Sequence, residues 1–128
     1  MSKKWIALLD GDEEDLFIWN TGINWFANEL ELKSFIDPNE FLVFARQLAN
    51  GPSLIIIDGI IPRGDELYWL SKIKTTPFQT VPIIMLGGDE IMLNKEQFTR
   101  AGATDCVYKP SSFKELQNLI MYIKQYVV

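Results

Sequence analysis

Short apolar runs alternate with longer segments of helical periodicity along the chain. The runs lie at residues 5–9, 33–36, 53–57, 81–86 and 104–108. Three of them are β-branched or apolar almost throughout, which is typical of strands that are buried on both faces of a parallel sheet. We therefore expect five parallel strands.

The segments between the apolar runs have the spacing of amphipathic helices. The first segment repeats an apolar residue every three or four positions, at Leu16, Trp19, Ile23, Phe26, Ala27 and Leu30. The last segment has a similar stripe, at Phe113, Leu116, Ile120, Ile123 and Val127. Helix start signals precede two segments, at Asp37-Pro38 and at Ser112. Five strands that alternate with five helices predict βαβ crossovers and one doubly wound α/β sheet.

Composition narrows the class of protein. The 128 residues form one predicted domain, 1–128, and the sequence has neither a signal-peptide pattern nor a membrane-spanning run, so we expect a cytoplasmic protein. The net charge of −5 argues against nucleic acid or a membrane surface as the main partner. The absence of histidine excludes a histidine general base and histidine-ligated zinc within this chain. The single cysteine excludes an intrachain disulfide.

Charged side chains follow three of the predicted strands. Asp10, Asp58 and Lys109 stand directly after apolar runs, and doubly wound sheets bind ligands at the carboxyl ends of their strands. Two carboxylates about 4 Å apart repel each other by roughly 1 kcal/mol in water and about 4 kcal/mol at an effective dielectric constant of 20. A divalent cation relieves this repulsion, and Mg²⁺ prefers oxygen ligands. Carboxylates, metal and lysine together are typical of a phosphoryl-transfer site.

The same residues resemble a known family. Asp10 follows the first apolar run, residues 53–62 read SLIIIDGIIP, and residues 101–105 read AGATD ahead of Lys109-Pro110. This combination resembles the response-regulator receiver domain of two-component signalling, and the resemblance covers the whole chain. It implies a flavodoxin-like (βα)5 fold with strand order 2-1-3-4-5. Because no output domain follows, the chain resembles a stand-alone receiver.

The resemblance also implies a mechanism. Asp58 would accept a phosphoryl group from a phosphohistidine on a sensor histidine kinase or a histidine phosphotransfer protein, and the phosphoprotein would regulate a downstream protein by binding it. Mg²⁺ would be bound by Asp10, Asp58 and the backbone carbonyl of Ile60. Lys109 would pair with the phosphate, next to a cis Lys109–Pro110 peptide bond. No enzyme activity is expected beyond self-phosphorylation and autodephosphorylation.

Three positions depart from the pattern of that family. Gly11 replaces the second of two adjacent acids after the first strand, which predicts weaker Mg²⁺ binding. Gly87 replaces a Ser or Thr that donates a hydrogen bond to the phosphoryl group, and Cys106 replaces an aromatic switch residue. Because a hydrogen bond to a charged group contributes about 1.5–3 kcal/mol, loss of the hydroxyl weakens the phosphorylated state roughly ten- to hundredfold. We therefore expect that the usual conformational relay is lost.

Asp12 has two interpretations. It either caps the first helix, where the acidic residues 13–15 interact favourably with the helix dipole, or it replaces the missing second acid at the metal. Cys106 is interpreted as a small buried hydrophobe, because unpaired cysteines usually behave in that way.

A group of residues near the end of the chain is a candidate output surface. It comprises Met92, Tyr108, Tyr122 and Tyr126. These side chains bind a partner in one interpretation and pack within the domain in the other, since tyrosine suits both environments. Phe17 and Trp25 lie off the main apolar stripe of the first helix. Exposure of either one makes it a candidate contact in a homodimer.

Two other functions are compatible with the sequence. The departures from the family pattern favour a pseudo-receiver, which is an interaction module that works without phosphorylation. Asp10-Gly11-Asp12 matches the nucleophile motif of the haloacid-dehalogenase superfamily, whose first acid is phosphorylated, and this match indicates a small phosphatase that uses Asp10. Glu13-Glu14 argues against the phosphatase, because a small or β-branched residue is expected after that motif.

Overall fold

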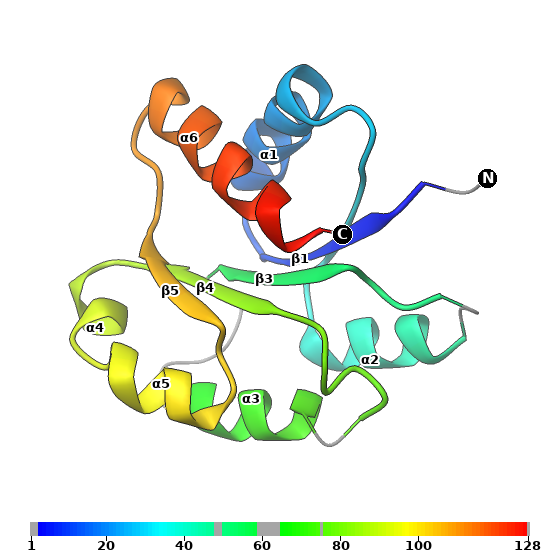
Figure 1. Ribbon diagram of the computed structural model, residues 1–128, viewed down its shortest axis with the longest axis vertical. Coiled ribbons are helices and arrows are strands. Elements are labelled where there is room, and N and C mark those ends of the chain that lie inside the picture. Colours follow the sequence, from blue (N-terminus) through cyan, green and yellow to red (C-terminus); the bar gives the residue numbers. More distant parts are fainter. Residues whose placement is uncertain (1–2, 48–49, 59–64, 75, 128) are drawn as a thin grey trace.

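The computed structural model describes residues 3–47, 50–58, 65–74 and 76–127. Its centre is a five-stranded parallel sheet in the order β2-β1-β3-β4-β5 (Figure 1). The strands are β1 (Trp5–Leu9), β2 (Glu31–Phe35), β3 (Leu54–Asp58), β4 (Ile83–Gly87) and β5 (Asp105–Tyr108). The doubly wound α/β topology and the strand order expected from the sequence are confirmed.

Helices cover both faces of the sheet (Figure 1). One face is covered by α1 (Glu13–Phe26) and α6 (Phe113–Ile123), and a short 3-10 helix, η1 (Lys124–Tyr126), continues α6. The other face is covered by α2 (Pro38–Arg46), α3 (Glu66–Lys74), α4 (Asp89–Met92) and α5 (Lys95–Ala101). Within the described part of the chain, no helix has the length and apolar character needed to cross a membrane.

Alternate side chains of the strands fill two hydrophobic layers. The layer toward α1 and α6 includes Ile6, Leu8, Trp19, Ile23, Ile56, Ile84 and Ile120. The layer on the opposite face includes Ala7, Leu9, Phe41, Ile55, Leu70, Ile83 and Met85. Burial on both faces explains why the strand sequences are almost continuously apolar. Each fully buried Leu or Ile side chain contributes about 1.5–3 kcal/mol to stability.

The region between β4 and β5 differs from the sequence prediction. One helix was expected there, whereas the structure has two short helices, α4 and α5. The interruption lies at Leu93 and Asn94, where the Asn94 side chain donates a hydrogen bond to the carbonyl of Glu90 at 2.8 Å. Asparagine disfavours helix interiors because its side chain competes for backbone hydrogen bonds. This local competition accounts for the break.

The register of the central strands positions the charged residues. β1 and β3 pair in parallel with Leu9 opposite Ile57. Asp10 and Asp58, each one residue further on, therefore lie side by side at the carboxyl edge of the sheet. β5 ends at the same edge, because it runs parallel to β4, and Lys109 follows it directly.

The turn between α5 and β5 depends on Gly102. This residue has a φ of 126°, a conformation that glycine adopts readily and other residues rarely. A Cβ at this position would lie 2.8 Å from Cγ of Lys74. Lys74 is held in place, because its Nζ donates hydrogen bonds to the carbonyls of Gln79 and Val81 at 3.1 and 3.2 Å.

We predict that Gly102→Ala lowers the free energy of unfolding by about 1–3 kcal/mol, because the methyl group adds backbone strain and a steric clash. Gly11→Ala is the matched control, since no atom lies within 4 Å of a Cβ built at position 11. Its effect should stay within about 0.5 kcal/mol. Urea denaturation followed by tryptophan fluorescence measures both variants, and equal stabilities would contradict this account.

Candidate functional site

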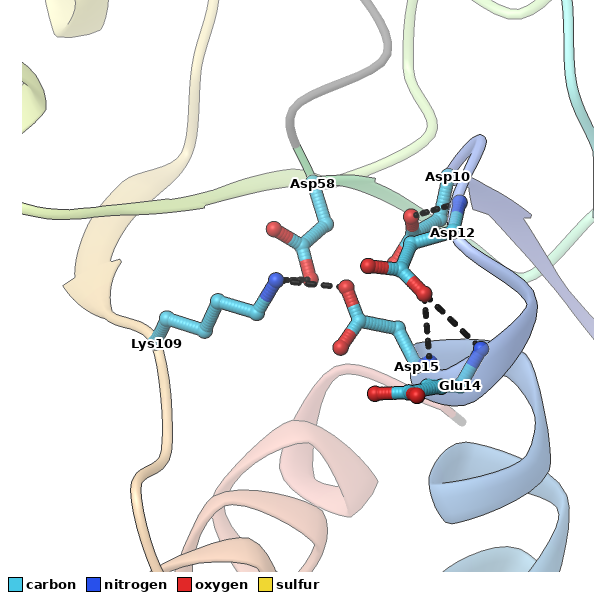
Figure 2. A network of polar contacts seen from close by, with 6 residues as sticks. All are labelled: Asp10, Asp12, Glu14, Asp15, Asp58 and Lys109. Carbon is cyan, nitrogen blue, oxygen red and sulfur yellow. Dashed lines mark hydrogen bonds and ion pairs between the residues drawn. The ribbon is translucent and has the colours of Figure 1, made fainter.

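An acidic pocket opens at the carboxyl ends of β1 and β3, beside the first turn of α1 (Figure 2). Its volume is about 410 Å³, and it is lined by Asp10, Gly11, Asp12, Asp15, Ile36, Asp58 and Lys109. One carboxylate oxygen each from Asp10, Asp15 and Asp58 lies within 4.8 Å of the other two. The pocket therefore concentrates oxygen ligands around a small volume.

Asp10 and Asp58 are almost completely buried, with 2% and 4% of their surface exposed. Oδ1 of Asp10 accepts a hydrogen bond from the backbone N–H of Asp12 at 2.9 Å. The Oδ2 atoms of Asp10 and Asp58 are buried and find no hydrogen-bond partner among the described residues. Oδ2 of Asp58 has only a longer ion pair with Nζ of Lys109, at 3.4 Å. Because buried acceptors without partners are costly, these two oxygens indicate a place for a cation.

Burial raises the pKa of both acids. For Asp10, the loss of hydration raises the pKa to about 7; the amide of Asp12 opposes this rise, and the charges of Asp58 and Asp15 add to it. Burial also raises the pKa of Asp58, against the attraction of Lys109. The ionised form of each acid is therefore destabilised in the absence of a cation, and a divalent ion reverses that effect.

The residues of the pocket fit a Mg²⁺ ion. Their side chains offer carboxylate oxygens, which Mg²⁺ prefers, and the unpartnered oxygens of Asp10 and Asp58 are available for coordination. Mg²⁺ usually retains several waters, so a few protein ligands are sufficient. Ile60, whose backbone carbonyl was expected as a further ligand, lies outside the described residues.

Lys109 reaches the pocket from the end of β5 (Figure 2). Its Nζ donates a hydrogen bond to Oδ2 of Asp15 at 2.5 Å and forms the ion pair with Asp58. Burial acts to lower the pKa of Lys109, but the hydrogen bond to Asp15 and the charge of Asp58 raise it above its usual value. The lysine is therefore fully charged at neutral pH and faces two carboxylates.

The expectation of a cis Lys109–Pro110 bond is wrong. The described residues contain no cis peptide bond, so this bond is trans. The trans form of a bond before proline is favoured by about 0.5–1 kcal/mol. Nζ of Lys109 reaches Asp15 and Asp58 with the bond in that form.

Asp12 caps α1, as one of its two interpretations proposed. Its Oδ1 accepts hydrogen bonds from the backbone N–H groups of Glu14 and Asp15, at 2.8 and 3.4 Å (Figure 2). The third member of the acidic cluster is instead Asp15, which the sequence analysis treated only as an acid in the first turn of the helix. The sequence held one signal for this role, which is the position of Asp15 three residues after the cap. Helical side chains tilt toward the helix N-terminus, which here lies beside the pocket.

Gly87, at the end of β4, is covered by an apolar side chain. A Cβ at this position would lie 2.3 Å from Cγ1 and 2.9 Å from Cβ of Ile91. Ile91 is itself buried and belongs to the hydrophobic core. A hydroxyl-bearing residue therefore has no room at position 87 while Ile91 keeps its place. Sequence reasoning identified the missing hydroxyl but not the residue that fills its space.

Cys106 is fully buried in the same hydrophobic layer, which confirms its interpretation as a small hydrophobe. Burial raises the pKa of its thiol above the usual value. The thiol is therefore protonated and unreactive at neutral pH.

The tyrosines of the candidate output surface make contacts within the domain. Tyr108 is 57% exposed, and its hydroxyl donates a hydrogen bond to Oδ1 of Asp89 at 3.0 Å. The hydroxyl of Tyr122 donates to Oδ2 of Asp105 at 2.5 Å and lies 2.8 Å from the hydroxyl of Tyr126. The packing interpretation therefore holds for Tyr122, which is half-buried, whereas partner binding at the accessible Tyr108 stays a prediction.

Three other predicted surface residues have different environments. Met92 is half-buried and packs against the core. Phe17 and Trp25 are 73% and 71% exposed, as their position off the apolar stripe of α1 indicates. The ring of Trp25 packs edge-on against Phe113 of α6, with centroids 5.5 Å apart.

A parallel sheet in the order 2-1-3-4-5, with an acidic pocket at the ends of its central strands, is typical of a flavodoxin-like receiver fold. The model of the response regulator receiver domain family matches residues 6–121. The chain therefore belongs to the response regulator receiver domain family. No curated protein sequence matches the chain.

The chain is similar in structure to several solved receiver proteins. The phosphorylated cyanobacterial phytochrome response regulator RcpA is 19% identical, with a TM-score of 0.77 over 98% of this chain and 94% of that chain. The receiver domain of the sensor histidine kinase PA1611 from Pseudomonas aeruginosa PAO1 is 19% identical, with a TM-score of 0.71 over 94% and 97%. The chemotaxis response regulator CheY4 of Vibrio cholerae is 17% identical, with a TM-score of 0.76 over 95% and 99%. At these identities the likeness shows the fold.

We predict that Gly87→Ser lowers the free energy of unfolding by about 1–3 kcal/mol, because the new side chain collides with Ile91. In an Ile91→Ala background the same substitution has room, so its cost should be smaller by at least about 1 kcal/mol. Urea denaturation measures the free energy of unfolding of the wild type, both single variants and the double variant, which together form a double-mutant cycle. Strictly additive effects would show that the two residues do not interact.

We predict that the metal-free protein loses stability as the pH rises from about 4 to 7. The pKa of Asp10 is about 7 in the folded chain against a usual value of 3.8, so the folded state binds more protons than the unfolded state in this range. The expected loss is on the order of 2–4 kcal/mol, and Asp10→Asn should remove most of it. Urea denaturation in EDTA across this pH range measures the slope. An unchanged slope in Asp10→Asn would assign the pH dependence to other groups.

Proposed function

We propose that the chain functions as a single receiver domain, residues 1–128, in a phosphorelay, and that Asp58 accepts the phosphoryl group. The observation that carries this proposal is the convergence of Asp10, Asp58 and Lys109 in one pocket, with an unpartnered buried oxygen on each acid. Because the 128 residues contain no histidine, the phosphohistidine donor lies outside them. A sensor histidine kinase or a histidine phosphotransfer protein supplies that group.

The transfer is a displacement at phosphorus. A carboxylate oxygen of Asp58 attacks the phosphorus atom, and the new P–O bond forms as the P–N bond to the donor imidazole breaks. The imidazole keeps the electron pair of the broken bond, and Asp58 becomes an acyl phosphate. Asp10, Asp58 and the backbone carbonyl of Ile60 are the residues proposed to hold Mg²⁺. The bound ion supplies neutralisation of the phosphoryl charge.

Lys109 supplies a fixed positive charge beside the acceptor. Its Nζ already lies 3.4 Å from Oδ2 of Asp58, so a phosphoryl group on Asp58 is within reach of the ammonium. A lysine ammonium binds phosphate as a point charge. Lys109 therefore orients the incoming group and stabilises the phosphorylated product.

Two similar proteins support the proposal. The receiver domain of PA1611 carries a magnesium ion coordinated in its active site cleft. The response regulator RcpA is phosphorylated. Since the present chain belongs to the same family and retains acids and a lysine at one pocket, the same chemistry is the simplest use of that pocket. Regulation of a downstream protein then follows from binding at the candidate output surface.

One observation favours a second function, that of a pseudo-receiver. Ile91 leaves no room for a hydroxyl-bearing side chain at position 87, because a Cβ there would lie 2.3 Å from its Cγ1. The consequence is a weaker link between the pocket and α4, because Gly87 offers no side chain to bind a phosphoryl oxygen. In this second function the chain binds its partner without phosphorylation.

We predict that incubation of the full chain with a small phosphodonor and Mg²⁺ adds one phosphoryl group, and that EDTA prevents the addition. Asp58→Asn should abolish it, because the amide lacks the nucleophilic carboxylate. Asp65→Asn is the matched control, since it removes one charge from an exposed acid, and it should be modified as the wild type is. Intact-protein mass spectrometry measures the addition.

An unmodified mass in the wild type would overturn phosphorylation at Asp58 and favour the pseudo-receiver. Modification at Asp10, together with turnover of a phosphate ester that is lost in Asp10→Asn, would instead indicate the haloacid-dehalogenase-like phosphatase. Peptide mapping of the modified chain separates these two sites.

A further inference from the structure

The carboxylate that is absent at position 11 has a counterpart on α1. Gly11 and Asp15 line the same pocket. An oxygen of Asp15 lies within 4.8 Å of oxygens of both Asp10 and Asp58, although Asp15 comes from the first turn of α1 and not from the end of β1. Its side chain is only 16% exposed. Asp15 is therefore placed to serve as the third acid.

An independent observation indicates that a cation fits this cluster. Asp10 and Asp58 are both more than nine-tenths buried, and among the described residues the Oδ2 atom of each finds no hydrogen-bond partner. Among the residues that the structure describes, Lys109 is the one cationic residue that lines the pocket. Its ammonium is directed mainly at Asp15, at 2.5 Å, and more distantly at Asp58, at 3.4 Å (Figure 2). Within the described part of the chain, Asp10 therefore forms no ion pair.

We propose that Asp15 is the third carboxylate of the cation site and that it exchanges Lys109 for the cation when the ion binds. Without the ion, Asp15 holds the ammonium of Lys109. With the ion, Asp15 binds the metal and Lys109 is released to the phosphoryl group on Asp58. The inference rests on the proposed function, because it assigns the cation and the phosphoacceptor to this pocket.

Electrostatics favours the exchange. A divalent ion among three carboxylates attracts each of them and repels the ammonium of Lys109, and both effects are strong where the surroundings are buried. A phosphoryl group on Asp58 adds negative charge within reach of the lysine, whose Nζ lies 3.4 Å from Oδ2 of Asp58. The cation competes for Asp15 and the phosphoryl group competes for Lys109, so both weaken the pairing of Asp15 with Lys109. Binding of the ion and availability of Lys109 become linked equilibria.

The test moves the carboxylate between positions 15 and 11. Calorimetry with Mg²⁺ alone compares the wild type, Asp15→Asn and the double variant Gly11→Asp/Asp15→Asn. We expect Asp15→Asn to weaken Mg²⁺ binding about tenfold or more, because it removes an anionic oxygen ligand. Gly11→Asp should restore most of the affinity, since a Cβ at position 11 meets no atom within 4 Å.

Glu14→Gln is the matched control. It removes the same charge from the neighbouring helical position, where the side chain is exposed and does not line the acidic pocket. Because solvent and salt screen that charge, its effect on Mg²⁺ affinity should stay below about threefold. Equal effects of Asp15→Asn and Glu14→Gln would overturn the inference, and so would a loss of affinity that Gly11→Asp does not restore.

Lys109→Met tests the exchange itself. In the wild-type background this substitution frees Asp15 as well as removing a nearby positive charge, whereas in Asp15→Asn it only removes the charge. We expect Lys109→Met to raise Mg²⁺ affinity in the wild-type background by a factor about two- to fivefold larger than in the Asp15→Asn background. Equal effects in the two backgrounds would show that Asp15 does not leave Lys109, and would overturn the exchange.

Asp58→Asn separates failure of this inference from failure of the proposed function. If Mg²⁺ affinity depends on Asp58 but not on Asp15, the proposed function stands and the role of Asp15 is refuted. If Mg²⁺ affinity does not depend on Asp58, or the wild type does not bind the ion, the phosphoacceptor site is wrong and the present inference falls with it.

Discussion

The candidate site depends on the burial of two carboxylates at the carboxyl edge of the sheet. Parallel pairing of β1 with β3 fixes Asp10 and Asp58 side by side, and the hydrophobic layers on both faces hold those strands in place. Each acid keeps an oxygen without a hydrogen-bond partner, at a cost of about 1–3 kcal/mol or more. Apolar packing offsets this cost in the metal-free chain, and a cation removes it. Stability and ligand binding are therefore linked at this edge.

Position along the chain was sufficient to predict the centre of the site but not its surroundings. Asp10, Asp58 and Lys109 follow apolar runs, and the ends of parallel strands converge, so their meeting could be predicted from the sequence. Asp15 was missed, because its position after the cap is only a partial signal and its direction also depends on where α1 begins and on how the helix is rotated. The contact of Ile91 with position 87 is likewise a matter of side-chain packing across a loop. The periodicity of a sequence predicts helices and strands, whereas contacts between side chains depend on how those helices and strands are placed relative to one another.

The region between the pocket and the candidate output surface uses different contacts from those of the family pattern. Cys106 is buried in the core, whereas Tyr108 is exposed and hydrogen-bonded to Asp89 in α4. Because this hydrogen bond is exposed to solvent, water competes for both of its groups. A two-state equilibrium needs about 5.5 kcal/mol to move from 1:99 to 99:1, so this contact alone does not form an all-or-none switch.

Gly11 and Gly87 show that two departures from one family pattern have different structural meanings. No atom lies within 4 Å of a Cβ built at position 11, so the absence of a carboxylate there requires no repacking. Asp15 brings a carboxylate into the same pocket. Position 87 is closed by Ile91, which belongs to the core. At position 87 the polar contact of the family pattern is therefore replaced by apolar packing. The two departures differ because Gly11 lines the acidic pocket, whereas the space beside Gly87 belongs to the hydrophobic core.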